Sequence, residues 1–72
     1  MTNVQFDLLL KLTSIRSDDI KAAARAVLVD GETQKAAAAA HNVNEGQLSR
    51  RLTVIREIEE IVIGLSMFYQ KG

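Results

Sequence analysis

The chain has 72 residues, no cysteine, no proline and a formal net charge of zero at pH 7. A chain of this length forms one domain and buries only about 60% of its unfolded surface, so its core is marginal and it gains by oligomerising. The lack of cysteine excludes disulfides and thiolate zinc sites and is compatible with a reducing cytoplasm, and no apolar stretch approaches the roughly 20 residues that cross a bilayer.

Two helices are expected in the first 31 residues. The first covers about residues 4–12 and ends at Thr13 and Ser14; its apolar side chains are Phe6, Leu9, Leu10 and Leu12. A second helix begins after Ser17, a good N-cap residue, with two aspartates in its first turn, where carboxylates favour the helix dipole. It runs to about residue 30, and Gly31 ends it. The apolar pattern contains no strand, which predicts an all-α fold.

The next stretch, residues 33–52, has the spacing of a helix-turn-helix motif. Thr33 caps a short third helix over residues 34–41, and Ala38 provides the small side chain that a close helix crossing needs. Asn42 falls at the turn, where the backbone must enter the left-handed region, and Asn44 can cap the helix that follows. The side chains expected to fill the angle between the two helices are Val43, Leu48 and Leu52.

The motif by itself leaves a plain helical hairpin open, because any two tightly joined helices want a small residue at their crossing. His41 stands where an aliphatic residue would pack better. We interpret it as a half-buried, hydrogen-bonded core histidine. A metal site would need several donors at set spacings, and the chain has no second histidine and no cysteine.

Basic side chains are concentrated on the motif even though the whole chain is neutral. Residues 33–56 carry four cations against Glu45 alone, a local charge of plus three. The four cations are Lys35, Arg50, Arg51 and Arg56. Lys and Arg on phosphates provide much of the affinity for DNA, so this local excess favours a nucleic-acid partner. The alternative is that these charges only solvate helix faces.

A fourth helix continues past the motif and carries two apolar stripes. The first stripe should pack on the rest of the domain and consists of Leu48, Leu52, Ile55 and Val62. The second repeats in alternating steps of four and three, the spacing of a helix that pairs with another, and consists of Val54, Ile58, Ile61, Leu65 and Phe68. We favour a homodimer interface on residues 54–69. The alternative is one wide apolar face covered by the first helix, and Gly64 leaves a kink or an earlier helix end open.

Four segments add a family resemblance: LLLKLTSIRSDDI, VLVDG, NEGQLS at residues 44–49, and a closing helix that ends in FY. Through them residues 6–69 resemble the PapB-type regulators of adhesin (fimbrial) operons. Residues 22–55 also resemble the KorA/TrfB-type repressors of conjugative plasmids, through AARAVLVDG and a G-x-x-S step at residues 46–49. Both groups are small helical DNA-binding proteins that control their own operons. The chain departs from the KorA type at Glu45, where that pattern has a basic residue, and in lacking its long tail.

The resemblance implies a recognition helix with Arg50 as the best base contact, and several dimers on repeated sites. The predicted base contacts are Glu45, Gln47, Ser49 and Arg50. The predicted phosphate contacts are Lys35, Asn44, Arg51 and Arg56. Arg51 is ambiguous, because its position faces partly inward and it can instead pair with an acidic neighbour. Reading in the major groove is assumed, and a minor-groove or shape-reading mode stays open.

We therefore predict a single domain over residues 1–72 that acts as a sequence-specific transcriptional regulator. It would repress its own or a neighbouring operon, of fimbrial or plasmid transfer and maintenance genes, by binding operator DNA as a homodimer or higher oligomer in the cytoplasm. The prediction includes no membrane, small-molecule substrate, cofactor, metal or catalytic residue, because no glycine-rich phosphate loop and no paired base and nucleophile are present. The alternative is a helical interaction module that binds another regulator through its last helix.

Overall fold

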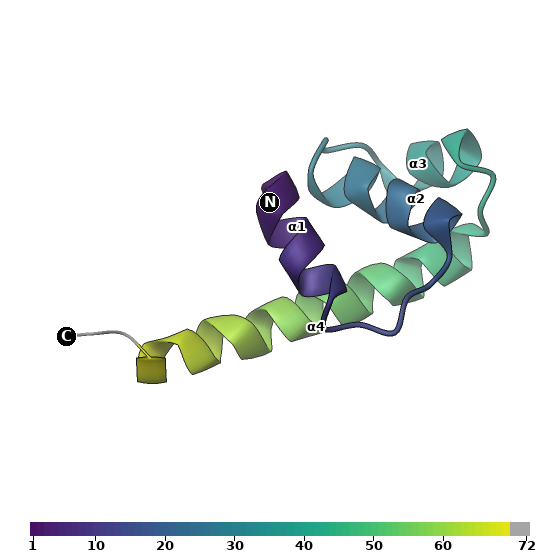
Figure 1. Cartoon of the computed structure of the whole chain (residues 1–72). Coiled ribbons are helices and arrows are strands. Elements are labelled where there is room, and N and C mark those ends of the chain that lie inside the picture. Colours follow the sequence, from purple (N-terminus) through teal and green to yellow (C-terminus); the bar gives the residue numbers. More distant parts are fainter. Residues whose placement is uncertain (70–72) are drawn as a thin grey trace.

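Four helices and no strands make up the part of the chain that the computed structural model describes, residues 1–69 (Figure 1). They are α1 (Asn3–Leu10), α2 (Asp18–Leu28), α3 (Gln34–Ala40) and α4 (Glu45–Tyr69). The all-α prediction with a long last helix is confirmed. The predicted domain span of residues 1–72 also includes the last three residues, which lie outside the described part.

The helix starts are fixed by local hydrogen bonds from the side chain of the preceding residue. Ser17 Oγ accepts from the backbone N–H of Ile20 at 3.3 Å, and Thr33 Oγ1 accepts from the backbone N–H of Ala36 at 3.1 Å. Both caps confirm the sequence prediction. A cap that was not predicted begins α1, where Thr2 and Gln5 form a reciprocal pair of side-chain to backbone bonds.

The helix ends differ more from the prediction than the starts. α1 ends at Leu10, two residues early, because the backbone N–H groups of Leu12 and Thr13 turn back to carbonyls three residues before them. The hydroxyl of Thr13 donates to the Leu10 carbonyl at 2.8 Å and holds this tight turn. α2 ends at Leu28, and Gly31 follows with a φ of 78°, a conformation that glycine adopts at little cost.

The core lies where α1, α2 and α3 meet the first half of α4. Its largest fully buried side chains are Phe6, Leu48, Leu52 and Ile55. Five buried alanines line the crossings of α2 and α3, namely Ala23, Ala24, Ala26, Ala37 and Ala38. Because alanine adds so little bulk, these two helices approach each other and α4 closely, and a small chain can still close a core.

Arg25 ties α2 to α1 at the edge of this core. Its guanidinium donates to Asn3 Oδ1 at 2.7 Å and to Asp7 Oδ1 at 2.6 Å, and lies 4.8 Å from the centre of the Phe6 ring. This contact with Asp7 is the one ion pair found within residues 1–69. Arg25 therefore has a structural role and contributes little free positive charge to the surface.

The second half of α4 extends beyond the other helices (Figure 1). It gives the molecule its elongated shape, with extents of 45 × 21 × 16 Å. The helix continues through Gly64 to Tyr69, so the earlier end that the sequence left open is not observed. From Ile61 to Tyr69 every residue is exposed. Within residues 1–69, no helix is both long enough and apolar enough to span a bilayer.

Candidate nucleic-acid interface

The turn between α3 and α4 has the hydrogen bonds of a Schellman motif. Asn42 adopts a φ of 53°, so the left-handed conformation predicted for it is confirmed. The Val43 N–H donates to the Ala38 carbonyl at 3.0 Å, and the Asn42 N–H donates to the Ala39 carbonyl at 3.4 Å. This pair of bonds satisfies the last carbonyls of α3 and reverses the chain within a few residues. The angle between α3 and α4 is thus set by the backbone as well as by packing.

The start of α4 is capped and anchored as the sequence predicts. Asn44 Oδ1 accepts from the backbone N–H of Gln47 at 3.0 Å, which makes Asn44 the N-cap. Leu48 and Leu52 are fully buried between the helices, while Val43 packs on the core but stays half-exposed. The helix is therefore held by one face, and its opposite face is presented to solvent.

Two of the four predicted base contacts lie together. Gln47 and Arg50 line one small surface hollow, which they share with Arg51. Ser49 is half-buried. It follows Gln47 by two residues, which on an α-helix is a rotation of about 200°, so the Ser49 side chain points to nearly the opposite side of α4. Glu45 is exposed in the first turn, away from this hollow. The structure thus separates the predicted set into one cluster and two isolated side chains.

The four predicted phosphate contacts, Lys35, Asn44, Arg51 and Arg56, are all exposed. For Arg51, the sequence left open that the side chain faces partly inward and pairs with an acidic neighbour, and the structure does not show this. It is exposed rather than turned partly inward, and within residues 1–69 it forms no ion pair with a carboxylate. The reason is its position on the flank of α4, beside Gln47 and outside the buried face.

A second, larger hollow lies next to the first. Its walls come from the connection between α1 and α2, from the first turn of α2 and from the start of α4. The lining residues are Ser14, Ile15, Arg16, Ser17, Ile20, Gln47 and Arg51. Figure 1 shows why these distant segments meet, because the chain between α1 and α2 runs alongside α4 before it rises into α2. Sequence reasoning gave Arg16 no role in the site.

His41 is half-buried, as predicted, but its expected hydrogen bond is not seen. Its backbone N–H donates to the Ala37 carbonyl at 3.1 Å, while its imidazole makes no hydrogen bond within residues 1–69. Across the same residues, no three His, Asp or Glu side chains lie together in the manner of a metal site. The histidine closes the end of α3 and is not part of either hollow.

The predicted pairing stripe changes its environment along α4. Val54 is half-buried, and Ile58 packs against the core. The other three members are exposed, Ile61 by 61%, Leu65 by 50% and Phe68 by 84%. Burial of this stripe by its own chain thus extends as far as Ile58 and no farther.

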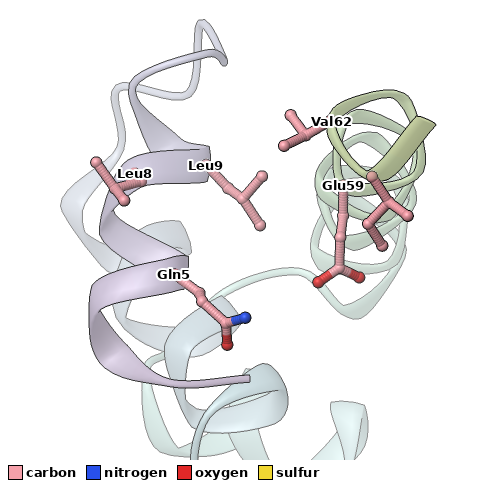
Figure 2. A pocket seen from close by; sticks show the side chains of 6 residues that line it. Gln5, Leu8, Leu9, Glu59 and Val62 are labelled. Carbon is pink, nitrogen blue, oxygen red and sulfur yellow. The ribbon is translucent and has the colours of Figure 1, made fainter. Parts of the chain in front are cut away.

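An apolar hollow separates α1 from the second half of α4. Gln5, Leu8 and Leu9 line one side, and Glu59, Val62 and Ile63 line the other. Figure 2 shows Leu9 and Val62 pointing toward each other across it, with Gln5 and Glu59 on its opposite walls. Val62 was predicted to pack on the domain, but it is 38% exposed because this hollow separates it from Leu9 and the rest of α1.

Comparison with known proteins gives two matches, one to a family model and one to a solved structure. A family model described as PapB, adhesin biosynthesis transcription regulatory protein, matches residues 1–69. The crystal structure of Escherichia coli FocB superimposes with a TM-score of 0.90 at 30% sequence identity, over 97% of this chain and 80% of that chain. None of the curated proteins matches the sequence significantly.

Proposed function

The chain belongs to the PapB family of adhesin biosynthesis transcription regulatory proteins, and on this premise we propose that it acts by binding operator DNA through α3 and the start of α4. Membership makes it a transcription regulator, which is not a class of enzyme. The predicted resemblance to the PapB type is thereby confirmed, while the resemblance to KorA/TrfB-type repressors stays a prediction.

The proposal is carried by the hollow that Gln47, Arg50 and Arg51 line on the outer side of the motif. Within residues 1–69 no carboxylate neutralises either arginine. The Arg50 guanidinium suits the O6 and N7 atoms of a guanine in the major groove, a contact worth about 1–3 kcal/mol of discrimination. Gln47 and Ser49 would add hydrogen bonds, and Glu45 would accept from a cytosine amino group.

Lys35, Asn44, Arg51 and Arg56 would hold phosphates and fix the register of the protein on the duplex. Such contacts add affinity without reading sequence. All four are exposed and come from both helices of the motif and from the turn between them. Replacing Lys35 with alanine should therefore weaken binding to all DNA sequences alike. It should also lower the slope of log affinity against log salt by about one, the contribution of one phosphate contact.

The exposed end of α4 supports a homodimer or higher oligomer. Within residues 1–69, the large side chains that follow Glu60 are all exposed, and they include Ile61, Leu65 and Phe68. A helix that is apolar on several faces is normally buried against another element. A second copy of the chain could cover it and would place two recognition helices on repeated sites in one operator.

The regulated genes follow from the family description together with this mode of binding. We propose that the protein represses its own or a neighbouring operon for adhesin (fimbrial) genes, in the cytoplasm where that DNA is found. Control of plasmid transfer or maintenance genes is the further possibility that the KorA/TrfB resemblance raises. A reporter fused to the operon promoter, with and without the protein, would separate repression from activation.

Selection of bound duplexes from a random pool, run with wild type and with Arg50→Ala, tests the proposal. We expect a motif with repeated half-sites from the wild type, which loses definition at one position in the variant. Arg50→Lys is a matched control, because it keeps the charge but loses the planar pair of donors. Equal losses on specific and random DNA would contradict the base-reading role of Arg50, and no enrichment by the wild type would contradict DNA binding itself.

A second function, an adaptor that binds another regulator, is favoured by the same exposed end of α4. The double variant Leu65→Asp, Phe68→Asp discriminates, because both side chains are exposed and the fold does not need them. Joint loss of self-association and DNA binding would support the dimeric regulator. Loss of a heterologous partner with DNA binding intact would support the adaptor.

A further inference from the structure

The hollow between the α1–α2 connection and α4 brings together polar groups from two segments that lie far apart in the sequence. Arg16 and Ser17 come from the connection, and Gln47 and Arg51 come from the start of α4. Its volume is about 330 Å³, larger than that of the hollow lined by Gln47, Arg50 and Arg51, and it is open to solvent. A tetrahedral anion fits such a space together with some of its hydration shell.

The charge of this hollow is positive and uncompensated. Arg16 and Arg51 are its only charged lining residues, and within residues 1–69 neither forms an ion pair. The nearest acidic residues in sequence, Asp18 and Asp19, lie in the first turn of α2 and do not line it. Two guanidinium groups present planar sets of donors that match phosphate oxygens.

We propose that this hollow holds one phosphate group of a DNA strand, with Arg16 and Arg51 as its two cationic contacts. The inference rests on the DNA binding proposed above and extends it to a segment outside the helix-turn-helix motif. Gln47 and Ser14 complete the site as hydrogen-bond donors to the remaining phosphate oxygens.

A DNA strand is the source of the phosphate that the geometry favours. Gln47 and Arg51 line this hollow and also the hollow that contains Arg50, so the two sites share a wall. A duplex read by Arg50 would therefore run past the α1–α2 connection, and one of its backbones would lie over Arg16. The phosphate group of a free small molecule is the other ligand that two arginines would bind. Such a molecule would need only this hollow and not the adjoining hollow that contains Arg50.

The test is the salt dependence of DNA affinity for wild type, Arg16→Gln and Arg16→Lys. Each phosphate contact contributes a slope of about 0.9 in log affinity against log salt. Arg16→Gln should lower the slope by that amount, so its affinity deficit should shrink roughly 3.5-fold between about 50 mM and about 200 mM salt. Arg16→Lys should keep the wild-type slope. Lys11→Gln is the control, because it removes the same charge from an exposed side chain that lines neither hollow.

The possible outcomes separate this inference from the proposed function. Wild-type binding with an unchanged slope in Arg16→Gln would overturn the phosphate site and leave the DNA-binding function intact. The same loss of slope in Lys11→Gln would also overturn it, because the effect would then be one of net charge. Titration with inorganic pyrophosphate, followed through the Arg16 and Arg51 side-chain NMR signals, forms a separate arm. Saturable shifts of these signals, with no effect of Arg16→Gln on the salt dependence of DNA affinity, would assign the hollow to a free anion. That result would overturn the proposal that the hollow holds a DNA phosphate.

Discussion

The two halves of α4 have opposite surroundings although they form one unbroken helix. In the first half, Leu48, Leu52 and Ile55 are buried by α1, α2 and α3, and the outer face is polar and basic. In the second half, from Ile61 onward, every residue is exposed and most are large and apolar. The first half is stabilised by its own chain, whereas the second half contributes no buried side chain to the core.

α4 thus contains two kinds of residue, those that are buried and stabilise the fold and those that are exposed and free to contact another molecule. Exposed apolar side chains in a contiguous patch are rare on proteins that work as monomers, since they favour association. The basic outer face of the first half and the apolar surface of the second are thus two distinct exposed surfaces at opposite ends of one helix, and we propose that each contacts a different partner. Substitutions in each half should change different measured properties.

The largest effect is expected from shortening a core side chain in the first half. Leu48→Ala removes a fully buried side chain at the crossing of α3 and α4 and should lower the free energy of unfolding by about 2–5 kcal/mol. Urea unfolding followed by circular dichroism measures this loss. Leu65→Ala is the matched control in the second half and should leave the unfolding of the monomer nearly unchanged. Similar losses for both variants would contradict the division of α4.

The next largest effect concerns self-association through the second half. Ile61→Asp should weaken it by at least about 100-fold, since a buried Ile is worth about 1.5–3 kcal/mol and a symmetric dimer loses two. Sedimentation velocity over a range of concentrations measures the change. Thr53→Asp adds the same charge to the exposed face of the first half and should leave the association state unaltered. Unchanged association in Ile61→Asp would place the interface elsewhere.

A smaller effect should follow from removing the cap that begins α4. Asn44→Ala leaves the Gln47 N–H without its side-chain acceptor and should cost about 1 kcal/mol of stability. Asn44→Ser keeps an acceptor oxygen and should recover most of the loss. Thermal unfolding of the two variants makes the comparison, and equal destabilisation by both would show that the capping bond is not the cause.

The smallest effect is expected at the ion pair that ties α1 to α2. Asp7→Asn keeps a hydrogen-bond acceptor for Arg25 but removes the charge, and both side chains are substantially exposed. Such pairs contribute roughly 0–1 kcal/mol. The difference in Tm from wild type should therefore be small at low salt and disappear at about 1 M salt, where charges are screened within about 3 Å. A difference that persists at high salt would indicate packing rather than charge.

The sequence predicted the helix starts and the turn well because their causes are local. Ser17, Thr33 and Asn44 each bond to a backbone N–H three residues later, so the signal and the structure lie in the same few residues. Asn42 likewise signals its own backbone conformation. The end of α1 was less predictable, because Leu12 continues the apolar pattern while the hydroxyl of Thr13 closes the helix two residues earlier.

The candidate site was predictable only in part. Periodicity along one helix placed Gln47 and Arg50 on a common surface, and the structure brings them together. It could not place Arg16, since that residue reaches α4 only through the path of the connection between α1 and α2. The environment of Arg51 depends on the same path. Contacts between segments far apart in sequence require the tertiary arrangement, and no local pattern encodes them.

The continuity of α4 through Gly64 has a mechanical consequence. Because the helix is unbroken, the direction in which its apolar side chains point is fixed relative to the direction of its basic side chains. Each residue inserted into α4 would rotate one end of the helix relative to the other by about 100° and lengthen the helix by about 1.5 Å. In a dimer joined at the apolar ends, the angle of pairing would therefore determine the phase at which the two basic ends meet the turns of a double helix.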